Sequence, residues 1–292
     1  DALFLDVDAD KDLDLVTVGD WMPIAVHHNR SGTFAPSTTP DGLENTEGWW
    51  NRLISADLDG DGDQDLVCGN IGWNSKFHGT LETPLHLYSN DFDDNGKADI
   101  VLAKSKGEKL LPVRGRECSS QQCPKILDQF PTYDAFAHAS LEQIYGPGKL
   151  DGGQHLQAKH MRSCIAWNEG GGKFQVQDLP SLAQAGPLNG LAAFDVNNDG
   201  HLDLMGAGNQ WGAEVETIRY DGGTGIVLLG DGKRTFTPMS VVGSGLFAWG
   251  HVKDLRVLPS GPDGRPWIVV ANNNDAMQVF RAAPPEGLLG QR

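Results

Sequence analysis

The stretch that decides the fold reads Asp57-Leu58-Asp59-Gly60-Asp61-Gly62-Asp63-Gln64-Asp65-Leu66-Val67. Its carboxylates alternate with other residues, and Gly62 permits the sharp turn that would aim them inward. Ca²⁺ takes six to eight oxygen ligands at roughly 2.3–2.6 Å. We therefore predict a calcium loop in which Asp57, Asp59, Asp61 and Asp65 supply side-chain oxygens and Asp63 supplies its carbonyl.

The same pattern occurs three more times, at spacings that preserve every ligand position. The first copy has Lys11 where the others have glycine, so we expect three to four Ca²⁺ ions. In chain order the predicted ligands are Asp6, Asp8, Asp10, Asp12 and Asp14; Asp57, Asp59, Asp61, Asp63 and Asp65; Asp91, Asp93, Asn95, Lys97 and Asp99; and Asp195, Asn197, Asp199, His201 and Asp203.

The loops differ from EF-hands in their twelfth residue and in their flanking segments. An EF-hand needs a bidentate Glu at its twelfth position and a helix on each side. Here the twelfth positions are Thr17, Cys68, Leu102 and Gly206, and each loop runs into an apolar pair typical of a buried strand. Each loop is therefore predicted to close a β-hairpin.

A second hairpin comes after most of these loops and completes a repeating unit. It consists of a strand, a glycine-rich turn and then Phe34, Phe174 or Phe236. A fifth, metal-free copy has strands predicted at 252–258 and 267–271. Four strands over roughly 40–50 residues indicate a β-propeller blade. The predicted fold class is all-β, a β-propeller or a large part of one, forming a single domain over residues 1–292.

The distance from the third acidic loop to the fourth is too long for one such unit. We predict an insertion at about 104–159 that protrudes from the third blade. A helix over 133–145 would place Phe136, Leu141, Ile144 and Tyr145 near one face. A sixth, metal-free blade in the same segment is the alternative.

Composition narrows the class of protein and its partners. The chain of 292 residues has 37 glycines and 16 prolines, which suits a turn-rich all-β protein, and its net charge is −16. Four calcium ions would offset half of that charge. Nucleic-acid binding is disfavoured because it needs clustered Lys and Arg. No apolar stretch approaches the roughly 20 residues of a membrane span. The chain starts at Asp1, which indicates a processed or excised piece without an export signal.

The cysteines favour an oxidising compartment. Cys118 and Cys123 lie five residues apart in a predicted loop, where we expect a local disulfide, with two free thiols as the alternative. Cys68 and Cys164 lie in apolar runs and are expected to be small core residues. Calcium loops and a disulfide together predict an extracellular, periplasmic or outer-membrane location.

A candidate ligand-binding face lies at the other end of the hairpins. If calcium closes the turn, the residues before the first strand and after the second lie on the opposite face. Aromatic and amide side chains recur there, as sugar rings and flat ligands require. The alternative is that the tryptophans pack between blades and the amides cap strand ends. The candidates are Asp20, Trp21, Trp50, Asn70, Trp73, Asn209, Trp211 and Trp249.

The D-x-D-x-D-G-x-x-D-L loops, with their glycine-turn-Phe hairpins, resemble FG-GAP or VCBS repeats. Further segments resemble the repeat region of ASPIC/UnbV-type bacterial extracellular proteins: Pro112–Arg116, Ile165–Phe174, Leu182–Gln184, Gly208-Asn209 and Gly230–Lys233. This resemblance implies an extracellular or outer-membrane propeller. Because the family usually has more blades, it also implies that further blades or domains of the same polypeptide complete the ring.

These observations predict a non-enzymatic, calcium-binding extracellular β-propeller that acts as a binding module for a glycan or an extracellular protein. A polysaccharide lyase or hydrolase is the alternative, because calcium propellers with this repeat can carry such chemistry. A structural scaffold is a third possibility. We single out no catalytic residue, since a bound ion would hold the loop carboxylates ionised and make them poor general acids.

Overall fold

The computed structural model describes residues 1–35, 40–214, 217–261 and 264–282. It is 37% strand and 11% helix. The chain forms two compact units, unit 1 (Asp1–Lys76 and Met161–Arg292) and unit 2 (Phe77–His160). Among the described residues, no helix is both long enough and apolar enough to cross a membrane.

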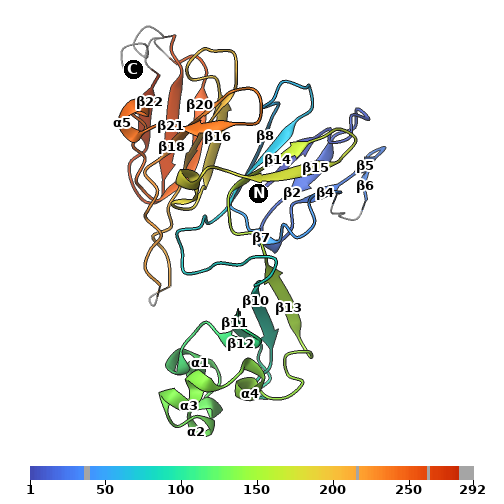
Figure 1. The fold of residues 1–292 in the computed structure, drawn as a ribbon, viewed down its shortest axis with the longest axis vertical. Helices are drawn as coiled ribbons and strands as arrows, with labels where there is room; N and C mark the ends of the chain where they lie inside the picture. The colour runs from blue at the N-terminus through green and yellow to red at the C-terminus, as the bar shows by residue number, and fades with distance from the viewer. Residues whose placement is uncertain (36–39, 215–216, 262–263, 283–292) are drawn as a thin grey trace. The chain divides into compact units, whose positions relative to one another are not determined.

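Unit 1 is built from antiparallel sheets (Figure 1). The first contains β1 (Ala2–Leu5), β2 (Asp14–Thr17) and β4 (Ala25–His27). The second contains β8 (Arg52–Ala56), β9 (Asp65–Gly69), β14 (Cys164–Asn168) and β15 (Phe174–Asp178). The third contains β16 (Gly190–Phe194), β17 (Asp203–Ala207), β18 (Ile226–Gly230) and β19 (Phe236–Pro238). The fourth contains β20 (Val252–Leu258), β21 (Trp267–Asn272) and β22 (Gln278–Arg281).

Short elements connect these sheets. They are the pair β3 (Asp20–Met22) and β7 (Gly48–Trp49), the pair β5 (Asn29–Arg30) and β6 (Thr33–Phe34), the 3-10 turn η1 (Ser181–Gln184) and helix α5 (Val241–Ser244). The first strands of the four larger sheets are neighbours, because β1 packs beside β8, β8 beside β16, and β16 beside β20. The mostly β fold is thus confirmed, and it is compatible with a β-propeller-like arrangement.

Three apolar cores fill the spaces between consecutive sheets of unit 1. Strand β9 shows why its sequence is continuously apolar rather than alternating. Leu66 and Cys68 belong to the core shared with the first sheet, whereas Val67 belongs to the core shared with the third. Strand β17 repeats this arrangement with Leu204 and Met205. Since successive side chains point to opposite faces, a strand covered on both faces needs apolar residues throughout.

Unit 2 is a four-stranded sheet accompanied by four short helices (Figure 1). The strand order is β12 (Lys109–Pro112), β11 (Asp99–Lys106), β10 (Leu85–Asn90) and β13 (Gln154–Ala158). The helices are α1 (Arg116–Gln122), α2 (Lys125–Gln129), α3 (Tyr133–His138) and α4 (Leu141–Tyr145). Tyr88, Phe92 and Val101 pack with Phe136 and Ile144 in a core of its own.

The place of this unit in the chain differs from the expected insertion at 104–159 of a third blade. Unit 2 contains the third acidic loop together with both of its strands. Strand β14 pairs with β9, with Cys164 opposite Cys68, so the unit is inserted within the second sheet of unit 1. Spacing between loops could not show this, because a pairing across almost 100 residues leaves no local periodicity.

The helix predicted over 133–145 is two helices. Ser140 ends the run because it forms a capping box, accepting from the Gln143 backbone N–H while its own N–H donates to the Gln143 side chain. Phe136 and Ile144 are nevertheless buried, as the apolar pattern predicted.

The disulfide predicted between Cys118 and Cys123 does not form, since both residues carry thiols. Cys118 lies within α1 and is partly buried, whereas Cys123 caps the end of that helix and is fully buried. The Cys123 thiol donates to Asp99 Oδ2 at 3.3 Å, and burial raises its pKa to about 12. Cys68 and Cys164 are buried core residues, as expected.

Candidate metal loops and aromatic surface

The four acidic loops share one backbone conformation. Their fourth and sixth residues have positive φ: Ala9 (62°) and Lys11 (77°), Gly60 (78°) and Gly62 (100°), Asp94 (63°) and Gly96 (83°), and Asn198 (59°) and Gly200 (89°). This left-handed region favours Gly, Asn and Asp. Lys11 adopts it nonetheless, so the first loop keeps the shape of the others despite its departure from the repeat pattern.

Two recurrent hydrogen bonds hold the first and ninth carboxylates in each loop. The first acid accepts from the sixth backbone N–H at 2.8–3.1 Å, with the pairs Lys11–Asp6, Gly62–Asp57, Gly96–Asp91 and Gly200–Asp195. The ninth acid accepts from the second backbone N–H at 2.9–3.3 Å, with the pairs Val7–Asp14, Leu58–Asp65, Phe92–Asp99 and Val196–Asp203. The ninth acids are buried in all four loops.

Carboxylate oxygens converge inside three of the loops. The groups Asp6–Asp8–Asp10, Asp57–Asp59–Asp61 and Asp91–Asp93–Asp99 each contribute oxygens within 4.8 Å of one another. Asp6 Oδ1 and Asp93 Oδ1 are buried without a hydrogen-bond partner among the described residues. In the fourth loop, Asn197 donates to Asp199 Oδ2 at 2.9 Å. Sets made of oxygen alone fit Ca²⁺ in the second and third loops.

Burial makes two ninth-position acids sensitive to a nearby cation. It raises the pKa of Asp65 to about 6, although the backbone N–H groups of Asn168 and Leu58 both donate to that carboxylate. Burial also raises the pKa of Asp203. A divalent cation beside either group would favour the charged form and offset this cost.

Three loops have a basic side chain beside them that the sequence pattern did not reveal. Arg234 Nε donates to Asp59 Oδ2 at 2.7 Å. Lys149 pairs with Asp94 in unit 2. His28 Nδ1 lies 3.4 Å from Asp14 Oδ2 in the first loop. Arg234 and Lys149 are far from their loops in the sequence, and His28 follows an ordinary strand. The sequence pattern therefore did not indicate that these side chains approach the loops.

The predicted tryptophans Trp211 and Trp249 lie together. Their ring centroids are 5.7 Å apart, and Trp249 is 50% exposed. His251 lies 6.3 Å from Trp211, and the Arg219 guanidinium lies 5.1 Å from the centre of the Trp211 ring. These four residues are the tryptophan cluster. It joins the segment after β17 to the segment before β20.

Two polar atoms of the tryptophan cluster have no hydrogen-bond partner among the described residues. They are Trp211 Nε1 and His251 Nε2, and both atoms are buried. Burial, together with Lys253, lowers the pKa of His251. Both atoms therefore lie inside the tryptophan cluster and not on its accessible surface.

A second aromatic pair joins the first and second sheets, but with a different member from the one expected. Trp21 lies 5.3 Å from Trp49 in an edge-to-face arrangement, and Asp20 is exposed opposite Trp49 in the β3–β7 pair. Trp50 is only 3% exposed, and its indole N–H donates to the Thr46 carbonyl. The structure therefore assigns Trp50 to the core, and Trp49 is the residue that sequence reasoning missed.

The predicted amides hold the backbone in place. Asn209 is fully buried; its side-chain N–H groups donate to the carbonyls of Gly223 and Trp249 at 2.8 Å, and its Oδ1 accepts from Gly223 N–H. Asn70 is also fully buried, and its Oδ1 accepts from the Ile71 backbone N–H. This matches the alternative in which amides cap strand ends. Asn209 thus positions Trp249 rather than facing a ligand.

Trp73 follows the second strand of the second sheet and has a charged neighbour. The Arg162 guanidinium lies 4.5 Å from its ring centre, and its backbone N–H donates to the Gln184 carbonyl. Trp73 is half-buried. The structure therefore places a cationic side chain over the Trp73 ring.

A polar depression of about 360 Å³ lies where the first strands of the four larger sheets begin. Its lining residues are Asp1, Asn51, Arg52, Asn189, Gln210 and Lys253. Arg52 Nη2 lies 2.9 Å from Asp254 Oδ1, which fixes the guanidinium. Gln210 directly precedes Trp211, and Lys253 is two residues after His251, so the depression lies next to the tryptophan cluster along both segments.

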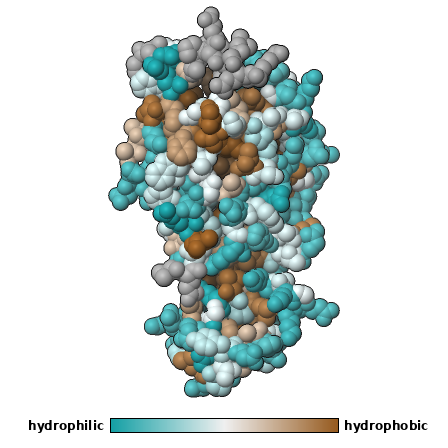
Figure 2. All heavy atoms as spheres, turned by 60° about the vertical axis from the view of Figure 1, so that its left-hand side comes forward, coloured by the Kyte–Doolittle hydropathy of each residue, from teal (hydrophilic) through white to brown (hydrophobic). Residues whose placement is uncertain are grey.

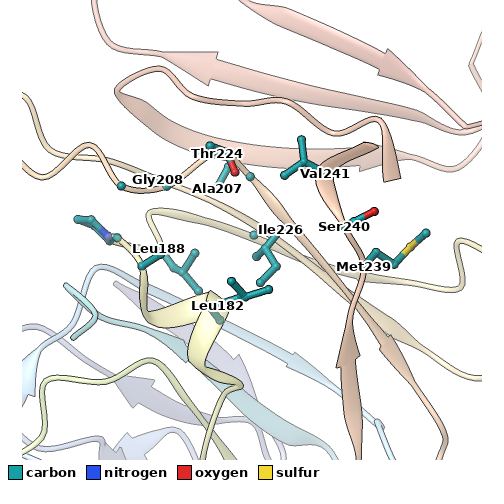
Figure 3. Close-up of a pocket in the computed structure, with 17 residues that line it drawn as sticks. Leu182, Leu188, Ala207, Gly208, Thr224, Ile226, Met239, Ser240 and Val241 are labelled. Atoms are coloured by element: carbon teal, nitrogen blue, oxygen red, sulfur yellow. The ribbon is translucent and has the colours of Figure 1, made fainter. Parts of the chain in front are cut away.

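An apolar hollow of about 150 Å³ lies between η1, β18 and α5 (Figure 3). Leu182, Leu188 and Ile226 converge on it, with Met239 and Val241 beside them. Exposed Val241 and Val242 extend the apolar surface, and Figure 2 shows brown hydrophobic atoms gathered on the side of unit 1 that bears α5. The hollow suits a small apolar group rather than a sugar ring.

The sheets and the four acidic loops together define a mostly β repeat protein. Residues 6–68, which include the first two loops, match the family model of the FG-GAP-like repeat. This match supports the interpretation of the chain as an FG-GAP repeat protein. No curated protein matches the chain.

Two solved structures show weak similarity to the chain. One is a lectin from Agrocybe aegerita, described for its recognition of non-reducing terminal N-acetylglucosamine; it has 16% identity and a TM-score of 0.21, over 97% of this chain and 80% of that chain. The other is BBS1N in complex with ARL6DN, with 9% identity and a TM-score of 0.17, over 97% of this chain and 92% of that chain. Both TM-scores are too low to support an argument about fold or function.

Proposed function

We propose that the chain is a non-enzymatic, calcium-binding β-propeller, or a large part of one, that acts as a binding module for a glycan outside the cytoplasm. An extracellular protein is the alternative ligand class. The relationship to ASPIC/UnbV-type proteins, the calcium ions and the extracellular, periplasmic or outer-membrane location all belong to this proposal. Further blades or domains of the same polypeptide would complete the ring.

The observation that carries the proposal is the tryptophan cluster. The half-exposed indole of Trp249 offers an apolar plane for the face of a sugar ring. Arg219 adds a charged group beside Trp211, and the polar depression contains Gln210 and Lys253, which neighbour the tryptophan cluster along the chain. Sites for small molecules combine apolar lining with a few placed polar groups in this way.

Calcium has a supporting role in this function. Each loop closes the turn between the first two strands of a sheet, and the tryptophan cluster lies at the opposite ends of such strands. Asp57, Asp91 and Asp195 begin the loops whose donors are oxygens. Bound ions would stabilise the folded sheets by mass action, without contacting the ligand.

A glycan array with the full chain tests the proposal. We expect binding in the presence of Ca²⁺ and a loss of at least about tenfold in Trp249→Ala, since truncating an aromatic anchor costs about 2 kcal/mol. Phe4→Ala is the matched control, because Phe4 is 61% exposed in β1 and lies outside the cluster. Equal binding by Trp249→Ala would contradict the assigned site.

Other outcomes separate the alternatives. Cleavage of a bound polysaccharide would support the lyase or hydrolase alternative. Capture of extracellular protein but no glycan would support the protein ligand. If neither class binds and calcium still stabilises the fold, the scaffold function is favoured.

A further inference from the structure

In each of the three loops of unit 1, one position on the neighbouring strand lies directly opposite the ninth acid. The registers pair Leu15 with His27, Leu66 with Ala166, and Leu204 with Leu228. One step further along each pair of strands, His28 lies opposite Asp14, Trp167 opposite Asp65, and Leu229 opposite Asp203. The next backbone N–H then donates to Oδ1 of the ninth acid at 2.8–2.9 Å, from Asn29, Asn168 and Gly230. The three positions are therefore structurally equivalent.

Only His28 among these three residues carries a metal-binding atom. Its Nδ1 lies 3.4 Å from Asp14 Oδ2 and 3.6 Å from Asp8 Oδ2. That atom is buried and has no hydrogen-bond partner among the described residues, although the side chain as a whole is 27% exposed. Asp14 is 1% exposed and is fixed by two backbone N–H groups. The imidazole nitrogen thus lies beside two carboxylate oxygens without forming a hydrogen bond to either.

The spacing and the chemistry of these three donor atoms differ from those of a calcium site. A tetrahedral ion with ligands at roughly 2.0–2.2 Å places its ligand atoms about 3.4 Å apart, which matches both distances. The three donor atoms lie within 4.8 Å of one another. Imidazole suits Zn²⁺ and related transition ions, whereas Ca²⁺ selects oxygen.

We propose that the first loop binds Zn²⁺, or a divalent transition ion of similar chemistry, through Asp8 Oδ2, Asp14 Oδ2 and His28 Nδ1. Its remaining coordination positions go to water or to a neighbouring loop carboxylate. The inference rests on the proposed metal-binding function and divides its loops into two classes. The loops starting at Asp57, Asp91 and Asp195 keep calcium, because Trp167 and Leu229 offer no ligand and the third loop has only oxygen donors.

Zinc binding in excess calcium tests this assignment. The full chain is stripped with a chelator, saturated with Ca²⁺ and titrated with Zn²⁺ by calorimetry, while bound metal is counted after dialysis. We expect one Zn²⁺ per chain in the wild type and at least tenfold weaker binding in His28→Leu, which installs the residue found at position 229. His155→Gln removes an imidazole from unit 2 and is expected to bind Zn²⁺ normally.

Histidine-selective NMR provides a second readout, in which Zn²⁺ but not Ca²⁺ shifts the His28 ring signals. Equal Zn²⁺ affinity in His28→Leu, or no Zn²⁺ uptake by the wild type, would overturn the proposal. If His28→Leu fails to fold by circular dichroism, His28→Asn and Asp8→Asn take its place. Calcium stoichiometry is measured on the same samples. Zinc uptake without calcium uptake would contradict only the calcium-binding proposal. Calcium uptake without zinc uptake would contradict only the zinc inference.

Discussion

Arg234 donates from Nε to Asp59 Oδ2 at 2.7 Å and thereby joins the turn between β18 and β19 to the second acidic loop. The same guanidinium pairs with Glu169 and lies 5.1 Å from the centre of the Trp167 ring. Asp59 is also a predicted calcium ligand. A metal ion in this loop and the Arg234 side chain therefore compete for one carboxylate.

Replacing Arg234 by Gln should change metal binding and stability in opposite directions. Removing a cation beside the loop should raise its Ca²⁺ affinity about threefold to tenfold, which corresponds to about 0.7 to 1.4 kcal/mol of repulsion. Loss of a partly exposed ion pair should lower metal-free stability by about 1 kcal/mol or less. Calorimetry and thermal melts measure the two effects. Lys233→Gln removes an equal charge outside this ion pair, and the prediction is wrong if both variants bind Ca²⁺ alike.

Removing calcium should lower the melting temperature of the wild type. An ion that binds only the folded state at about 100 times its Kd stabilises it by about 2.7 kcal/mol. Asp61→Ala should bind one Ca²⁺ fewer and lose part of the response to chelator, while Asp128→Ala, an acid outside the loops, should behave as the wild type. Glycan binding by folded Asp61→Ala should be unchanged. A melting temperature that does not change on chelation would argue against a stabilising role for calcium.

The contribution of Asp65 to the stability of the metal-free protein should rise as the pH falls from about 7.5 to 5. The folded pKa of Asp65 is raised to about 6, above its unfolded value, so its contribution is present below the unfolded pKa and is lost as pH rises through about 6. A shift of two pKa units corresponds to about 3 kcal/mol at most. Melts of the wild type and of Asp65→Asn across this range measure the contribution as the difference between them, which should shrink when calcium is bound. The same pH trend in both metal-free proteins would disprove the prediction.

Asn209→Ala should destabilise unit 1 by about 1–3 kcal/mol, because it leaves the part-buried Gly223 and Trp249 backbone groups without their side-chain partner. Denaturant unfolding measures this cost. If Asn209 were a ligand-binding residue instead, the substitution would weaken glycan binding with little change in the unfolding midpoint. Trp249→Ala should show the reverse, with weak binding and a near-normal midpoint.

Short-range features of this chain could be predicted well from its sequence. Four loops with one acid spacing share one backbone and one set of hydrogen bonds, even where Lys11 replaces glycine. The strands expected at 252–258 and 267–271 are β20 and β21 almost to the residue. The local pattern sufficed because turn chemistry and alternation of apolar residues act over a few residues.

Features that depend on distant residues could not be predicted. Nothing near Cys68 indicates that its strand pairs with Cys164, and nothing near Asp59 points to Arg234. The choice between Trp49 and Trp50 depends on a one-residue register, since neighbours in an extended chain face opposite ways. Whether an asparagine binds a ligand or its own backbone is likewise decided by the segment that approaches it.

The insertion of unit 2 between β9 and β14 has a consequence for the order in which the protein folds. During synthesis β9 leaves the ribosome with β8 as its only available partner in the second sheet, and all of residues 77–160 must emerge before β14 does. Unit 2 contains both partners of β10 and its own apolar core within that span, so it can form first. Completing the second sheet then requires a contact of high sequence separation, which is intrinsically slow. Until that contact forms, the apolar strand β9 exposes one unpaired edge.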